Sequence, residues 1–257
     1  MISRRLYQHI QSHNWFAVAV DFLIVVIGVF VGIQVSNWNA ERVERRAART
    51  YIERIREDIH ASASSIGNMV TYYRAVKQHA LAALAAFERP QAELDQQFLI
   101  DAYQASQILM RTVERSTYDE ILSAGAMNSI PDVQARRRLA NYYKNVDAIE
   151  ELMRYVPPYR ENLRRYLPYA VQAAIFERCD DIANIDSGGY ASATLPGRCD
   201  LDLPTETIAT GIAAIRTPGL KLDLARRLAD LDTKLKNYQR LVDRGAALDQ
   251  FLAEAEI

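Results

Sequence analysis

The sequence is poor in residues that bend or interrupt a chain. Among 257 residues there are 10 glycines and 8 prolines, and no repeat or low-complexity tract is present. Apart from Pro90, the prolines lie between residues 131 and 218. Because glycine and proline are the residues that most disfavour helix interiors, we expect long helices over most of the chain.

The sequence also lacks an excess of charge of either sign. Its 31 basic residues are matched by 32 acidic ones, so the formal net charge is −1. A chain without a positive excess has no general attraction to nucleic acid. We therefore expect no nucleic-acid partner.

The sequence also lacks the common catalytic motifs. No Walker loop, GxGxxG, GxSxG, HExxH or CxxC pattern occurs. His60 follows Glu57 and Asp58, which suggests a metal or acid–base site, but polar flanks of this kind are also common beside helical seams. The sequence accordingly predicts a protein that is not an enzyme, with no catalytic residue, no metal site and no cofactor.

What the sequence does contain is one long apolar run, WFAVAVDFLIVVIGVFVGIQV, from Trp15 to Val35. Its 21 residues carry a single formal charge, Asp21. As a helix the run would be about 30 Å long, which is the thickness of the bilayer core. Trp15 and Trp38, the only tryptophans, bracket it where indole rings favour the membrane interface. We therefore predict a transmembrane helix at 15–36 rather than a buried core helix.

A cleaved signal peptide is the other interpretation of such a run. The apolar stretch exceeds the usual length of a signal-peptide core, and no A-x-A-like cleavage site follows it. We expect an uncleaved anchor preceded by a short polar tail at 1–14, too small for an output domain.

Four residues of this segment share one face of the predicted helix. At 100° per residue, Gly28 and Gly32 lie within about 20° of Asp21, and Asn39 is in line with it. Small residues four apart let a second helix approach closely, and a carboxylate in the membrane usually faces protein or water. This stripe predicts a helix contact in the membrane. The alternatives are chance for the glycines and snorkelling of Asp21 toward the headgroups.

The same segment carries a resemblance to a known family. VDFLIVVIGVFVGIQVSNWNAER resembles the opening of a family of uncharacterised bacterial single-pass membrane proteins. Their pattern is an acidic residue, Ile-Gly, Leu-Gln or Ile-Gln, and Asn-Trp-Asn, here Asp21, Ile27-Gly28, Ile33-Gln34 and Asn37-Trp38-Asn39. The family more often has Glu in place of Asp21 and Ala in place of Gly32. A second stretch, Thr117 to Tyr143, is similar to the family's Leu/Ile-Ser-x-Gly turn and Arg-Leu-x-x-Tyr-Tyr helix. The resemblance implies a membrane-anchored helical protein and brings no known activity.

After the span, a long helix is predicted to about Phe87. Asn37 or Asn39 could cap it, or it could continue directly from the span. Its core-like positions alternate by three and four, as in a coiled-coil seam. They are Ile52, Ile55, Ile59, Ser62, Ile66, Met69, Tyr73, Val76, Ala80, Ala83 and Phe87. The seam could pair with another protomer or with later helices of the same chain, and the second is favoured.

Further amphipathic helices complete an all-α fold, in which residues 37–257 form an extramembrane helical bundle. We expect helices at Glu93–Glu114, from a cap at Ser116 or Thr117 to Gly125, at Ile130–Tyr155, at Tyr159–Arg178 with a kink at Pro168, at Thr205–Arg216, and from Pro218 to the end. The last has a near-heptad seam of Leu220, Leu224, Leu228, Leu231, Leu235, Tyr238, Leu241 and Val242.

Residues 179–204 are predicted to form an irregular loop. Cys179 and Cys199, the only cysteines, flank it. We expect a disulfide that closes this loop, worth on the order of 3 kcal/mol in the chain-entropy model, with two free thiols as the alternative. Zinc would need further ligands, and the acidic residues of the loop lack the spacing of a calcium-binding loop.

The side of the membrane is indicated in two conflicting ways. Two arginines precede the span and four follow it at 42–49, which by the positive-inside rule places the large domain in the cytoplasm. The cysteine pair instead indicates an oxidising compartment, and long domains translocate largely regardless of charge. We favour a bacterial inner-membrane protein with a periplasmic domain; a cytoplasmic domain is the alternative.

Taken together, these features predict a non-catalytic, single-pass membrane protein. Its expected role is a scaffold or accessory subunit, a homo-oligomer or part of a larger membrane complex, with the lipid bilayer as its other partner. The alternative is an extracytoplasmic helical-bundle receptor that senses a ligand and signals through a partner. Genes for a transporter nearby would favour the first role, and a neighbouring kinase the second.

Overall fold

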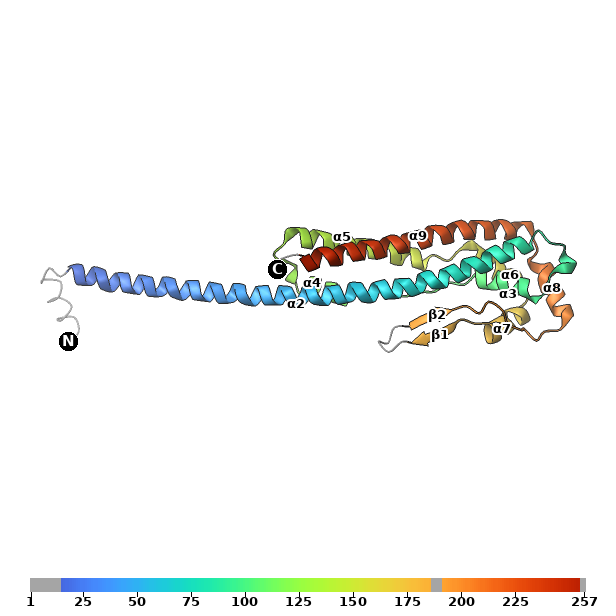
Figure 1. Ribbon diagram of the computed structural model, residues 1–257, viewed down its shortest axis with the longest axis horizontal. Helices are drawn as coiled ribbons and strands as arrows, with labels where there is room; N and C mark the ends of the chain where they lie inside the picture. The colour runs from blue at the N-terminus through green and yellow to red at the C-terminus, as the bar shows by residue number, and fades with distance from the viewer. Residues whose placement is uncertain (1–14, 186–190, 255–257) are drawn as a thin grey trace.

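The computed structural model describes residues 15–185 and 191–254. It consists of one very long helix, α2 (Trp15–Ala86), with the remaining elements packed along its second half. Figure 1 shows the first half of α2 extending beyond this bundle, away from the other labelled helices and strands. The predicted all-α class is confirmed, and the predicted tail at 1–14 lies outside the described residues.

No break separates the apolar segment of α2 from the bundle. Asn37 and Asn39 lie inside the helix rather than capping a second one. The chain has no proline or glycine between Gly32 and Gly67, so nothing in this stretch interrupts the backbone hydrogen bonds. The apolar segment and the core helix are therefore one element of 72 residues.

The predicted seam of α2 is confirmed position by position. All eleven predicted side chains are buried, including Ser62, whose hydroxyl donates to the Glu114 carbonyl over 3.0 Å. The helices that cover the seam belong to the same chain: α9 (Pro218–Glu254) runs alongside it, and α3 (Gln96–Ala105) packs near its end. The seam is thus filled within one protomer.

The other helices of the described chain form the rest of the bundle. They are α4 (Ser116–Ser123), α5 (Val133–Arg154), α6 (Pro158–Tyr166), α7 (Tyr169–Arg178) and α8 (Thr205–Ile215), with short 3₁₀ turns at Gln91–Glu93 and Ala126–Ser129. Local signals set several ends. Asp132 caps α5 by accepting from the Gln134 amide over 2.7 Å, and Gly125 takes the expected left-handed conformation with φ 65°.

Three predicted helix boundaries were wrong. The helix expected to reach Glu114 ends as α3 at Ala105. Pro168 does more than kink its helix: with no N–H to donate, it separates α6 from α7. The first amides of α4 bond to the carboxylates of Glu114 and Asp58, over 2.9–3.2 Å, rather than to a Ser116 or Thr117 side chain.

The predicted irregular loop at 179–204 contains a β-hairpin, which corrects that prediction. Strands β1 (Ile182–Ile185) and β2 (Ala191–Thr194) pair antiparallel, with Ile182 opposite Thr194 and Ile185 opposite Ala191. Strand β2 packs on α2, where Ala193 is buried. Each strand has only four residues, too few for a clear alternation to show in the sequence.

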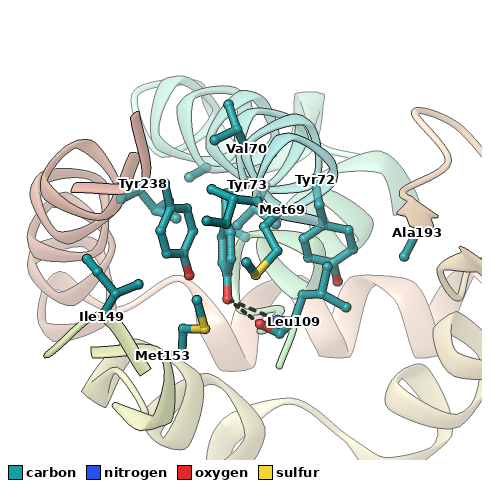
Figure 2. Close-up of a cluster of buried hydrophobic side chains, with 14 of the residues drawn as sticks. Met69, Val70, Tyr72, Tyr73, Leu109, Ile149, Met153, Ala193 and Tyr238 are labelled. Atoms are coloured by element: carbon teal, nitrogen blue, oxygen red, sulfur yellow. Dashed lines mark hydrogen bonds between the residues drawn. The ribbon is translucent and has the colours of Figure 1, made fainter. Parts of the chain in front are cut away.

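The centre of the bundle is rich in tyrosine and methionine. Tyr73 projects from α2 between Tyr238 of α9 and the turn at Leu109, and Met69 and Met153 fill the space beside it (Figure 2). The Tyr73 and Tyr238 ring centroids are 5.9 Å apart. These large, fully buried side chains hold α2, α5 and α9 together.

Candidate functional site

The first candidate region is the apolar part of α2. It is the one helix in the described residues that is long and apolar enough to cross a membrane, with a mean hydropathy of 2.6. None of that window is buried against the rest of the chain. A core helix of a soluble protein would be mostly covered, whereas this segment presents bare Val, Ile and Phe side chains. The helix could therefore span a bilayer.

The structure places the predicted stripe on this uncovered part of α2. Asp21, Gly28, Gly32 and Asn39 are all exposed within one chain. A Cβ added at either glycine would meet nothing within 4 Å. The stripe is thus helical and unobstructed, but its helix contact stays a prediction. Trp15 and Trp38 lie at the two ends of the apolar segment and are 73% and 63% exposed.

The cysteines form the second predicted feature. Cys179, at the end of α7, and Cys199 are joined in a disulfide, with their Cα atoms 5.8 Å apart. This confirms the predicted pairing. The Gln104 side chain donates to the Cys179 carbonyl, and the Leu201 amide donates to Gln96 over 3.1 Å. Both ends of the hairpin segment are therefore fixed to α3.

A third feature, a buried polar centre, was not predicted. The inward positions of α9 follow a strict three–four alternation: Leu220, Leu224, Arg227, Leu231, Lys234, Tyr238, Leu241, Gly245, Leu248 and Leu252. The predicted seam had Leu228 and Leu235 in place of Arg227 and Lys234 because it followed hydrophobicity. Those leucines are only partly buried, while Arg227 and Lys234 are 2% and 3% exposed.

Arg227 of α9 and Arg160 of α6 lie at the carboxyl end of α3. Arg227 donates to the Ala105 and Gln107 carbonyls over 3.3 and 2.8 Å, and Arg160 to the Ser106 carbonyl over 2.9 Å. The last carbonyls of a helix lack partners within it and carry partial negative charge. Guanidinium groups from elsewhere in the chain satisfy them here. The chain can therefore leave the helix after Ala105 inside the bundle without buried, unpaired carbonyls at these three residues.

Lys234 faces the hydroxyl of Tyr73. Its Nζ lies 3.4 Å from that oxygen and 4.5 Å from the ring centroid. The Tyr73 hydroxyl in turn donates to the Leu109 carbonyl and accepts from the Leu109 amide, both over 3.0 Å (Figure 2). Burial lowers the pKa of Lys234 to about 8. A substrate would reach this amine only if the bundle opened, so we interpret it as an internal packing group.

The two histidines among the described residues each contact an aspartate. His60 is two-thirds exposed, with its Nε2 3.1 Å from Asp249 of α9. His79 and Asp101 form a buried pair, with Nδ1 2.7 Å from Oδ1, that links α2 to α3. This pair was not predicted from the sequence. Among the described residues, no group of three or more His, Cys, Asp or Glu side chains could hold a metal ion.

Comparison of the chain with protein-family models, with curated proteins and with solved structures gave no significant match. The interpretation of function therefore rests on the geometry of the chain itself.

The buried lysine predicts an unusual pH dependence of stability. Between pH 8 and 10 the unfolded chain keeps the Lys234 proton while the folded chain loses it, so the free energy of unfolding should rise with pH, by about 2 kcal/mol from this group. Below pH 8 both states hold the proton and this slope vanishes. Above pH 10 the buried tyrosines, whose pKa burial raises, reverse the trend.

Urea unfolding of the detergent-solubilised chain, followed by circular dichroism at pH 7 to 10, measures this dependence. Lys234→Met should flatten the rise and stabilise the protein at pH 7, because a buried charge is removed. Lys236→Met, an equal charge change at an exposed position of α9, is the control and should keep the slope. An unchanged slope in Lys234→Met would contradict the assignment.

Proposed function

We propose that this protein is a non-catalytic, single-pass membrane protein that serves as a scaffold or accessory subunit and assembles through its transmembrane helix and helical domain. The observation that carries the proposal is the contrast between the two halves of α2. The second half is filled by the chain's own helices, whereas the first half is uncovered and presents the stripe of Asp21, Gly28, Gly32 and Asn39.

The position of the bundle around α2 supports assembly through this stripe. Ala48 is the first fully buried residue of α2 and lies about 180° around the helix from Asn39. The bundle therefore covers the side of α2 opposite the stripe. A second helix could lie against the stripe without meeting the bundle of the same chain.

Asp21 supplies a reason for such a contact. An ionised carboxylate in hydrocarbon is costly unless it has a donor or a proton. The glycines on the same face would let a partner helix come close enough to supply that donor. The partner would be a second copy of this chain or a helix of another membrane protein.

Assembly through the stripe can be measured by crosslinking in membranes. Asp21→Leu should leave the helix inserted but weaken association by about 1 kcal/mol, roughly fivefold, because the polar contact is lost. Gly28→Leu and Gly32→Leu should weaken it by steric blockage. Phe22→Leu, on an exposed neighbour off the stripe, is the matched control. If all four variants crosslink like the unmodified chain, the span is only an anchor.

We further propose a bacterial inner-membrane location with the bundle in the periplasm. The disulfide between Cys179 and Cys199 supports this side, because structural disulfides persist in oxidising compartments and are rare in the cytoplasm. A cytoplasmic bundle is the alternative that the arginines after the span favour.

The sidedness prediction uses the fact that the chain has only these two cysteines. In membranes denatured without reductant, a thiol-alkylating reagent should label neither cysteine, and after reduction it should label both. Mass spectrometry of the chain counts the labels. Rapid labelling of both before reduction would remove the main support for a periplasmic bundle.

A ligand-sensing bundle is the second candidate function, and one cavity favours it. A cavity of about 390 Å³ between α5 and α9 is within the size range of small-molecule sites. Arg138, Asn141, Asn145 and Arg244 line it, and no acidic side chain is among its described lining residues. Hydrogen-bond donors without carboxylates suit an anionic ligand.

Thermal unfolding with a panel of small carboxylates and inorganic phosphate tests this candidate. A ligand at a hundred times its Kd would stabilise the bundle by about 2.7 kcal/mol. Arg244→Gln should abolish the stabilisation, while Arg240→Gln, exposed one turn away, should keep it. Stabilisation of all three proteins alike would indicate a general salt effect.

A further inference from the structure

The stretch of α2 between the apolar segment and the bundle carries a basic face. Trp38, Arg42, Arg45, Arg46 and Arg49 line one hollow of about 380 Å³ along the helix. At 100° per residue these five positions fall within a sector about 100° wide. We call this surface the Trp38–arginine face. All five residues are exposed.

The acidic residues of this stretch lie outside the sector. Glu41 and Glu44 are about 100° and 160° around the helix from Arg42. Glu41 pairs with Arg45 over 2.8 Å at the edge of the face. The Arg42 guanidinium lies 5.9 Å from the centre of the Trp38 ring. The face is therefore positive, with an aromatic ring at its membrane end.

The distance of the Trp38–arginine face from the apolar segment determines which part of a lipid its side chains can contact. Trp38 follows the last apolar residue by three positions, and the headgroup layer extends roughly 5–8 Å beyond the hydrocarbon core. Arg42 lies about 6 Å further along the helix than Trp38, Arg46 about 12 Å and Arg49 about 17 Å. The long side chains of Arg42 and Arg46 can bend back to headgroup level, as arginines near helix ends do. Arg49 lies beyond it and acts only through the surface potential.

We propose that the Trp38–arginine face binds the phosphodiester headgroup of acidic phospholipids in the leaflet next to the bundle. The guanidinium groups supply planar, charge-assisted donors to phosphate oxygens. The indole ring of Trp38 sits at the depth of the glycerol backbone, where such rings are favoured. The occupant is lipid rather than an acidic protein because the face begins at the membrane boundary and its charge is concentrated there.

The bundle leaves this face open. Ala48, where the bundle first covers α2, lies about 120° around the helix from Arg42 and about 100° from Arg49, and about 60° from Arg45 at the edge of the face. The face meets the stripe at one edge: Arg46 lies about 20° around the helix from Asn39, whereas Arg42 lies about 60° from it. Lipid binding through Trp38 and Arg42 can therefore be tested separately from assembly through Asp21 and the glycines, whereas Arg46 lies at the edge that the two surfaces share.

The test uses Trp38 as its own reporter. Trp15→Phe in the full-length chain leaves Trp38 as the sole tryptophan. The protein is reconstituted into vesicles of phosphatidylcholine with a minor share of phosphatidylglycerol, and only one of the two lipids carries bromine, which quenches tryptophan fluorescence. The ratio of quenching by the two brominated lipids, corrected for their bulk proportion, gives the enrichment of acidic lipid at Trp38.

We expect phosphatidylglycerol to be enriched severalfold, with the enrichment falling as salt is raised. Arg42→Gln should reduce it about fivefold, Arg46→Gln less, and Arg49→Gln least. The matched control is the triple variant Arg226→Gln/Lys236→Gln/Arg240→Gln, which removes three positive charges from the exposed side of α9. It should keep the full enrichment.

Three outcomes would overturn the proposal. Equal quenching by the two lipids would show that the face does not select acidic headgroups. An equal loss in the α9 triple variant would assign the effect to net charge rather than to this face. Loss of the enrichment on adding glycerol phosphate at unchanged ionic strength would assign the face to soluble phosphates.

Discussion

One unbroken helix, α2, joins the uncovered apolar segment to the packed bundle. The first part of α2 is uncovered and, apart from the stripe that begins at Asp21, largely apolar, and the second part is the central strip of a packed bundle. Because no proline or glycine pair breaks the helix between them, rotation of one part fixes rotation of the other. The seam residues Ile52, Ile55 and Ile59 are buried where α2 packs in the bundle. Their packing therefore also determines which face the apolar segment presents to a neighbour.

The interior of the bundle shows how a core formed on one long helix accommodates polar groups. Arg227 and Lys234 occupy seam positions where leucine would pack without a desolvation penalty. Arg227 satisfies the carbonyl groups at the end of α3, which would otherwise be buried without partners, so its charge stabilises a specific chain reversal. Tyr73 acts similarly on the turn at Leu109. Polar contacts of this kind specify where helices end, while the apolar seam supplies most of the stability.

The elements predicted correctly from sequence are those set by local periodicity. The α2 seam and the helix end at Gly125 each follow from residues a few positions apart. The predictions were wrong where contacts between residues far apart in the sequence determine the local structure. The end of α3 depends on arginines more than 50 residues away, and the hairpin depends on packing of β2 against α2. For α9, a strict alternation of three and four positions places Arg227 and Lys234 on the buried face. The prediction instead chose the neighbouring leucines because they are more hydrophobic. The stripe of Asp21 and the glycines could be placed on a helix face from sequence, but the proposed contact of this face with a second helix is not one that a single chain can contain.

The exposed stretch of α2 from Trp38 to Arg46 has no core to stabilise it. An isolated helix of this length would be marginal in water, since nucleation is costly. Here both ends are already helical, one in the apolar segment and one in the bundle, so no nucleation is needed. The pair of Glu41 with Arg45, four residues apart, adds a few tenths of a kcal/mol. A helix held at both ends transmits tilt and rotation along its axis instead of absorbing them. The basic face on this stretch is consequently held at a fixed angle to both the apolar segment and the bundle.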